Sequence, residues 1–336
     1  MYSTCLAFLL SPFQRMIFWD ACFVTTTVLH TSYVNLFFLI SLITNIDYIK
    51  NRIIVMKLIF IFILLLFVNF SFPQKYKFDN TIGQFKNASS FYINPAGFIY
   101  VADISTDEIT AIDTLGNLLL KIGGYGWRES AFDNPVDVFA DALKVFVSDK
   151  NNHRIQRFDK NLNYSFQIYT RESDIEEERF GYPLSAVMSN QGDVFILDSE
   201  NSRIIKFDIF GEFIQNFGGY DYGNYALQKP LQLAVSKKNN LFVIDGNQII
   251  IFDQYGNGVG KISGTKDFTS IKIIFDWMTV TSDENIYVTN LNSPELNLKE
   301  ILLDDTPEGI KIISSLIFNN KLYLLTKKEI LVFNKN

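Results

Sequence analysis

Cysteine and histidine are scarce in this sequence. Its 336 residues include two cysteines, Cys5 and Cys22, and two histidines, His30 and His153. Only His153 lies beyond residue 74, where an apolar N-terminal stretch gives way to a more polar sequence. The main part of the chain therefore has no disulfide and no cysteine nucleophile, and it lacks the histidines for a zinc site built from several of them.

Nucleotide-binding and serine-nucleophile motifs are missing too. No G-x-S-x-G sequence occurs, and the glycine-rich "GNGVGKISG" lacks the spacing of a phosphate-binding loop. Residues 1–74 hold four basic and two acidic residues, and without them the net charge falls from −6 to −8. A negative charge disfavours a broad phosphate-binding surface, so we expect no nucleic-acid partner. Because the motifs and histidines described above are missing, we also expect no cofactor.

The stretch that begins at Met56 has the anatomy of a secretory signal peptide. Met56 and Lys57 form a charged start, Leu58–Val68 are all apolar, and polar residues follow. This apolar run is too short to span a bilayer, which takes about 20 residues. We therefore expect a signal peptide or membrane anchor at 56–74, export to the periplasm or the cell exterior, and a mature domain at 75–336. Residues 1–55 would then be an upstream extension.

The alternative takes Met1 as the true start. Ile17–Thr44 and Ile53–Phe72 would then be two apolar segments that anchor the protein in a membrane. In either case, we expect membrane contact only through this N-terminal leader.

The rest of the chain repeats itself. The segment "GGYGWRESAFDNPVDV" at Gly123–Val138 aligns without a gap on "GGYDYGNYALQKPLQL" at Gly218–Leu233, 95 residues later. Pro183 lies 48 residues after Pro135 and 47 before Pro230, so the offset divides into two units of about 47 residues. The three prolines are expected to mark the first strand of each unit, and a period of this length is typical of propeller blades.

Each unit has the same internal order, which is an apolar strand, a polar residue, a turn and a second strand. In the third unit we expect four strands, at 185–189, 194–198, 203–208 and 213–217. One series of strand-end residues recurs through the units and continues to Thr326: Asp103, Asp149, Asp198, Asp245 and Asn290. Six such positions indicate six units.

These units resemble NHL repeats, as "VSDKNNHRIQRFD" and "ILDSENSRIIKFD" illustrate. The match is best at residues 132–170 and 180–219 and weakest at 275–336. The resemblance implies an all-β fold, a six-bladed β-propeller of four-stranded antiparallel blades, of the TolB-like superfold and of an exported bacterial type. The last unit has only three strands, and we expect residues 75–80 to supply the fourth and close the ring.

His153 invites an enzymatic interpretation because an aspartate and an arginine flank it. In the aligned units its place is taken by Asp107 and Ser202, so we interpret His153 as a turn residue that braces a loop. The strand-end aspartates are expected to accept hydrogen bonds from turn amides. Arg154 and Arg203 align with each other and can pair with acidic residues between blades.

Function is expected in the loops that precede the first strands. The loops 123–134, 170–182 and 218–229 occupy the same place in successive units, so they should emerge on one face. Tyrosine, tryptophan and arginine carry much of the contact energy at interfaces. The expected binding residues are Tyr125, Trp127, Arg128, Arg171, Tyr182, Tyr220, Tyr222 and Tyr225.

We therefore expect a non-catalytic scaffold that binds a protein or glycan partner through these loops. The alternative is a propeller enzyme, either a calcium-dependent hydrolase of the lactonase type or a lyase. In the calcium-dependent case the oxygen atoms of the strand-end series would have to converge on one metal ion.

Overall fold

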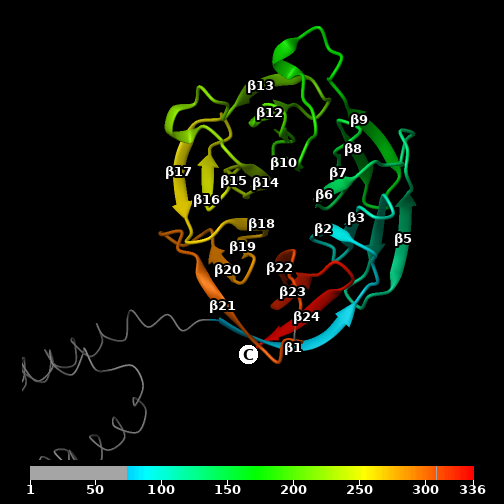
Figure 1. Ribbon diagram of the computed structural model, residues 1–336, viewed down its shortest axis with the longest axis vertical. Helices are drawn as coiled ribbons and strands as arrows, with labels where there is room; N and C mark the ends of the chain where they lie inside the picture. Colours follow the sequence, from blue (N-terminus) through cyan, green and yellow to red (C-terminus); the bar gives the residue numbers. More distant parts are fainter. Residues whose placement is uncertain (1–73, 308) are drawn as a thin grey trace, which may run out of the picture. The chain divides into compact units, whose positions relative to one another are not determined.

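The computed structural model describes residues 74–307 and 309–336, which form strands joined by loops (Figure 1). The predicted extension 1–55 and leader 56–74 lie outside these residues, except Gln74, which begins the first strand. Two short 3-10 helices, η2 (Glu176–Glu178) and η3 (Gly223–Tyr225), lie in loops. Within the described part of the chain, no helix has the length and apolarity that crossing a membrane requires.

Four antiparallel sheets have four strands each, arranged in sequence order. The first contains β2 (Ala88–Ile93), β3 (Ile99–Asp103), β4 (Glu108–Ile112) and β5 (Leu118–Gly123). The second contains β6 (Pro135–Ala140), β7 (Lys144–Asp149), β8 (Arg154–Asp159) and β9 (Tyr164–Ile168). The third contains β10 (Ser185–Met188), β11 (Val194–Asp198), β12 (Arg203–Phe207) and β13 (Phe213–Phe217), within a residue of the predicted bounds. The fourth contains β14 (Pro230–Val235), β15 (Leu241–Asp245), β16 (Gln248–Phe252) and β17 (Gly258–Ser263).

A fifth sheet has eight strands, in the order β18-β19-β20-β21-β1-β24-β23-β22. One half contains β18 (Phe268–Ile274), β19 (Trp277–Ser282), β20 (Ile286–Asn290) and β21 (Lys299–Asp304). The other half contains β22 (Ser314–Phe318), β23 (Lys321–Leu325), β24 (Ile330–Lys335) and β1 (Gln74–Ile82).

Strand β1 joins the two halves of this sheet. It pairs antiparallel with β24, from Tyr76 opposite Lys335 to Ile82 opposite Ile330, so the predicted pairing of residues 75–80 with the last strand is confirmed. Its first residues also pair in parallel with β21, starting with Gln74 opposite Ile301. The described residues therefore form four separate sheets and one merged sheet, whereas one sheet for each of six blades was expected.

The first strand of each unit lies in the middle of the structure (Figure 1). Strands β2, β6, β10, β14, β18 and β22 contact one another in this order, and β22 contacts β2 to close the ring. The inner strands are buried almost throughout, whereas β5, which forms an outer edge, is largely exposed. Apolar side chains of neighbouring sheets fill the space between them and form the core.

Candidate functional site

The strand-end aspartates hold the loop that leads into their own sheet. Asp103 ends β3, and its carboxylate accepts hydrogen bonds from the backbone amides of Lys86 (2.6 Å) and Asn87 (3.1 Å), just before β2. Equivalent bonds recur in three more sheets, from Asp133 N to Asp149 (2.8 Å), from Gly181 N to Asp198 (3.2 Å) and from Gln228 N to Asp245 (2.8 Å). The predicted role of these aspartates as acceptors of backbone bonds is confirmed. They fix the point where each loop enters its sheet.

Asn290 does not belong to this series. It ends β20, the third strand of its half-sheet, and lies opposite Trp277 at the other end of the sheet. Its side-chain oxygen accepts a bond from the amide of Asn292 (2.9 Å), as Asp113 does from Leu115 after the third strand of the first sheet. The predicted register of the fifth unit is wrong because its preceding loop, residues 264–267, and its first turn, residues 275–276, are both shorter than in the four units before it.

His153 is a turn residue, as predicted. It has φ 51°, and the residues aligned with it, Asp107 and Ser202, have φ 52° and 48°. All three lie in the left-handed region, which aspartate, asparagine and histidine tolerate better than most residues. In every unit with this turn length, the residue at this position adopts the left-handed backbone conformation that the turn requires.

His153 also braces a neighbouring loop. Its Nδ1 accepts a hydrogen bond from the backbone amide of Tyr182 (3.0 Å), and Arg171 Nη1 lies 3.2 Å from the same nitrogen. Arg171 forms an ion pair with Glu200 (2.8 Å), and the Tyr182 ring packs edge-on against the imidazole, 4.2 Å between centroids. Burial, and then the charge of Arg171, lower the pKa of His153 below its usual value. A neutral imidazole with a free Nδ1 is the form that accepts these bonds.

Arg154 fixes the loop between the first and second sheets. Its buried guanidinium is 2.7 Å from Asp149 and donates to the backbone oxygens of Trp127 (2.7 Å) and Ala131 (2.9 Å). Arg203 repeats the arrangement one sheet later, 3.2 Å from Asp198. Each arginine pairs with an aspartate of its own sheet, so the predicted pairing between blades is wrong. The physical reason is that the hairpin places each arginine directly opposite its strand-end aspartate.

The predicted binding residues fall into two groups. Four aromatic side chains are exposed, Tyr125 (79%), Trp127 (49%), Tyr182 (42%) and Tyr220 (93%). Arg128 is exposed and Arg171 half-buried. All six lie on loops that run beside the turns between second and third strands, so they emerge at one end of the sheets, which we call the loop face. We call these six residues the loop-face patch.

Tyr222 and Tyr225 are half-buried and pack against the core. The ring of Tyr222 lies 6.4 Å from Phe217 and 6.2 Å from Phe252, and Tyr225 lies 6.3 Å from Phe252. Tyr225 also covers Gly258, where an added Cβ would lie 2.1 Å from its ring. Their contact with a partner stays a prediction, and their rings expose less surface for it than the four aromatic rings of the loop-face patch.

Tyr169 is a neighbour of the patch that the sequence reasoning missed. Its ring meets the ring of Trp127 at 89°, with 5.4 Å between centroids, while the Arg154 guanidinium lies 4.8 Å from the tryptophan ring. The loops before β6 and β10 are thus in contact through Trp127 and Tyr169. Tyr220 stands on a separate loop, before β14.

A polar network that sequence reasoning also missed fills the centre of the ring. Besides Lys272 of β18, each inner strand contributes at least one polar side chain: Ser90, Asp137, Ser185, Gln232, Ser270 and Ser314. Three of them follow a repeat proline by two residues, since Pro135 begins β6, Pro230 begins β14 and Pro183 lies just before β10. This proline-x-polar spacing is the signal that could have revealed the network. A bulge in the strand register just before Ser90, Asp137 and Ser270 sets the direction of these side chains.

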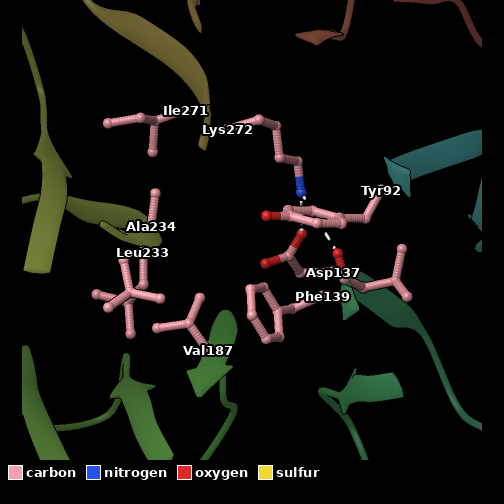
Figure 2. A pocket seen from close by; sticks show the side chains of 10 residues that line it. Tyr92, Asp137, Phe139, Val187, Leu233, Ala234, Ile271 and Lys272 are labelled. Carbon is pink, nitrogen blue, oxygen red and sulfur yellow. Dashed lines mark hydrogen bonds and ion pairs between the residues drawn. The ribbon is translucent and has the colours of Figure 1, made fainter. Parts of the chain in front are cut away.

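Asp137 is the hub of this network, and Figure 2 shows it beside Lys272. It accepts hydrogen bonds from Ser90 Oγ (2.5 Å), Ser185 Oγ (2.5 Å) and Gln232 Nε2 (2.9 Å). Lys272 Nζ lies 2.8 Å from Asp137, and the two side chains are 3% and 5% exposed. The cavity beside them measures about 10 Å³, the space of one water molecule at most. The centre of the ring is therefore filled by side chains that bond the inner strands to one another, and it has no room for a substrate.

The strand-end oxygens do not converge on one point. They lie at the entrances of different loops, and each is occupied by backbone amides. In residues 74–307 and 309–336, no three histidine, cysteine, aspartate or glutamate side chains gather as metal ligands.

Comparison with known proteins identifies one repeat and a fold. The sequence model of the NHL repeat matches residues 180–207, which cover β10 to β12. Protein brain tumor from Drosophila melanogaster is 33% identical over 151 residues, 44% of this chain and 14% of that protein. The B-box type zinc finger protein ncl-1 from Caenorhabditis elegans is 32% identical over 146 residues, 43% of this chain and 17% of that protein. The matched segments span less than a fifth of either relative.

Solved structures resemble the chain at the level of the fold. A virginiamycin B lyase from Staphylococcus aureus has a TM-score of 0.53 and 11% identity, over 74% of this chain and 95% of the lyase. A streptogramin B lyase structure has a TM-score of 0.51 and 10% identity, over 75% of this chain and 95% of that chain. At this identity the likeness concerns architecture alone. The described part of the chain is an all-β propeller with four-stranded antiparallel blades, and residues 180–207 match an NHL repeat.

Proposed function

We propose that this protein is a non-catalytic binding scaffold that holds a polypeptide partner on the loop-face patch. The observation that carries the proposal is the contrast between side chains and backbone in these loops. Trp127 and Tyr182 expose their rings, while buried Arg154 and the imidazole of His153 hold the backbones beneath them. A rigid loop loses little entropy on binding, which favours contact through exposed aromatic side chains.

The enzymatic alternative has less support. The strand-end aspartates that a calcium site would need are used as braces for four different loops, and the centre of the ring is filled by the Asp137 network. The likeness to lyases extends to the fold only and carries no catalytic residue to this chain.

Photo-crosslinking at Tyr220 tests the proposal. Tyr220 is almost fully exposed, so a photoreactive phenylalanine analogue there should not disturb packing. The protein captured from the native source is identified by mass spectrometry, purified and titrated against the full chain. We expect Trp127→Ala and Tyr182→Ala each to weaken its binding by about 1–2 kcal/mol, as for interface hot spots.

Tyr255→Ala is the matched control, because Tyr255 is equally accessible but lies on the turn between β16 and β17, at the opposite end of the sheets. Unchanged binding by both patch variants would refute the proposal. Binding of glycans by the full chain, with no protein captured, would replace the polypeptide partner by a glycan.

We also propose that the eight-stranded sheet functions as two blades, the fifth made of β18–β21 and the sixth of β22–β24 with β1. In support, β18 and β22 contact each other and take successive places in the ring of inner strands. The chain is then a six-bladed propeller whose last two blades share a hydrogen-bonded outer edge.

Export through the leader is a further part of the proposal, and it rests on the sequence from Met56 to Gln74. Mass spectrometry of the native protein should find no peptides from residues 1–50. Recovery of such peptides would refute the start at Met56.

A further inference from the structure

A pocket opens at the end of the sheets opposite the loop face. Its volume of about 470 Å³ lies in the range of small-molecule sites. Five turns that join first to second strands surround it, one in each of five successive units. We name it the channel-mouth pocket and define it by the turn residues Pro95, Asp141–Lys144, Ser189–Gly192, Ser236–Lys237 and Phe275.

The bottom of the channel-mouth pocket is apolar and closed. Tyr92, Phe139, Val235 and Ile273 form it, and the rings of Tyr92 and Phe139 lie 5.1 Å apart. The Tyr92 hydroxyl donates to the backbone oxygen of Ile273, so it presents no free polar group to the pocket. Figure 2 shows Tyr92 and Phe139 next to the Lys272–Asp137 pair that fills the channel beneath. A ligand can therefore enter only from the mouth, and it meets apolar surface at the bottom.

The rim carries charges of both signs, and one lysine there has no carboxylate partner. Among the described residues, Lys144 Nζ has one polar contact, with Met188 Sδ at 3.7 Å, and no carboxylate partner. Asp141 lies in the same turn, but its Oδ1 accepts bonds from the amides of Leu143 and Lys144, both at 2.7 Å. Lys237, on the facing turn, is 3.3 Å from Asp276. An anion at the rim would give Lys144 the partner that the chain does not provide.

Phe275 supplies an independent indication of binding. It occupies one of the two positions that connect β18 to β19, with φ 54°, where glycine or asparagine is the usual residue. Its ring stacks on Phe318, 6.2 Å between centroids, but is still 42% exposed at the rim, and Lys237 Nζ lies 5.5 Å from it. A large exposed aromatic residue in an unfavourable conformation suits a binding role better than a turn-forming role.

We propose that the channel-mouth pocket binds a small organic anion with an apolar body and a single carboxylate. The body lies against Tyr92, Phe139 and Val235, and the carboxylate meets Lys144 at the rim. The site is at the opposite end of the sheets from the loop-face patch, so it does not rest on the function proposed above.

Decanoate, decanol and decylammonium test the proposal, because they share one apolar body and differ in charge. Titration calorimetry on the full chain at neutral pH should give a dissociation constant for decanoate below 1 mM, which is about −4 kcal/mol. Decanol should bind about tenfold more weakly, and decylammonium more weakly again. Absence of decanoate binding, or equal affinity for decylammonium, would overturn the proposal.

Three variants locate the site. Lys144→Ala should weaken decanoate about tenfold and leave decanol unchanged, whereas Lys238→Ala, an exposed neighbour outside the pocket, should change neither. Phe275→Asn suits the turn and should retain the melting temperature while weakening both ligands about fivefold. Ala142→Trp fills the mouth and should abolish binding. If decanoate binds Lys144→Ala and Phe275→Asn as tightly as it binds the original chain, its site is elsewhere and the proposal fails.

Discussion

Lys272 Nζ lies 2.8 Å from Asp137 Oδ1, although 135 positions separate the two residues in the sequence. Because both side chains are buried, loss of one partner leaves a charge without its counter-ion in the middle of the ring. We expect Lys272→Met to lower the free energy of unfolding by about 3–5 kcal/mol. Urea denaturation followed by fluorescence measures the change.

The double variant Lys272→Met with Asp137→Asn is the control for this prediction. It removes both charges while retaining a side chain that bonds Ser90 and Ser185, so it should lose less stability than Lys272→Met alone. An equal or greater loss would show that packing, and not the ion pair, determines the effect.

Arg154 should contribute more to the free energy of unfolding than Arg203, although the two occupy equivalent positions. The Arg154 side chain is 1% exposed and bonds three loop carbonyls as well as Asp149, whereas Arg203 is 17% exposed. Arg154→Ala should cost about 3–5 kcal/mol, and Arg203→Ala about 1–2 kcal/mol. Limited proteolysis should also cut residues 124–134 faster in Arg154→Ala, and uncut loops in that variant would contradict the bracing role.

Stability should depend on pH through His153. Its pKa in the folded protein is lowered, so the unfolded chain binds a proton more readily. The stability that the neutral imidazole gives to the folded protein is complete above the unfolded pKa of about 6.5. It is lost as the pH falls below that value. The melting temperature should therefore fall between pH 7.5 and pH 5 more in the original chain than in His153→Asn, whose side chain also tolerates a positive φ. An NMR titration that places the pKa of His153 above 6.5 would contradict this expectation.

Tyr225 and Gly258 provide a test of whether Tyr225 belongs to the core. Gly258→Ala introduces a methyl group where the Tyr225 ring lies, so we expect a loss of about 1–3 kcal/mol. Tyr225→Ala should cost about 1–2 kcal/mol by removing contacts with Phe252. The double variant should be more stable than the sum of the two losses predicts, and strict additivity would mean that the ring does not rest on Gly258.

Deletion of residues 74–82 tests the merged sheet. The chain would lose the ladders of β1 with both β24 and β21, and the burial of Tyr76 and Ile82. We expect a loss of several kcal/mol in the free energy of unfolding and a greater tendency to aggregate, because β24 and β21 become unpaired edges. An unchanged urea midpoint and a monomeric elution profile would show that β1 is dispensable.

The repeating part of the fold could be predicted from the sequence because each unit folds locally. The 47-residue spacing of Pro135, Pro183 and Pro230 reflects one meander of four strands, and the strand bounds of the third unit agree within a residue. The strand-end aspartates could be identified for the same reason, since their partners are loop amides 16 or 17 residues away.

Features that depend on distant strands or on irregular units could not be predicted. The Lys272–Asp137 pair and the parallel pairing of β1 with β21 join residues more than 100 positions apart, and no local pattern encodes such contacts. Asn290 was misplaced because the loop before β18 and the turn at Phe275 are both shorter than in the four preceding units. Tyr222 and Tyr225 are of a residue type that is common at interfaces, and only their packing on Phe252 distinguishes them from Tyr220.

The pairing of β1 with β24 also constrains synthesis. The strand made first in this domain bonds to the strand made last, so a nascent chain on the ribosome remains an open arc until residue 335 has emerged. Until β21 has emerged β1 has no partner strand, and its antiparallel ladder cannot form before β24 is made. A product truncated before β24 cannot close the circle, and its exposed strand edges make it a target for chaperones and proteases.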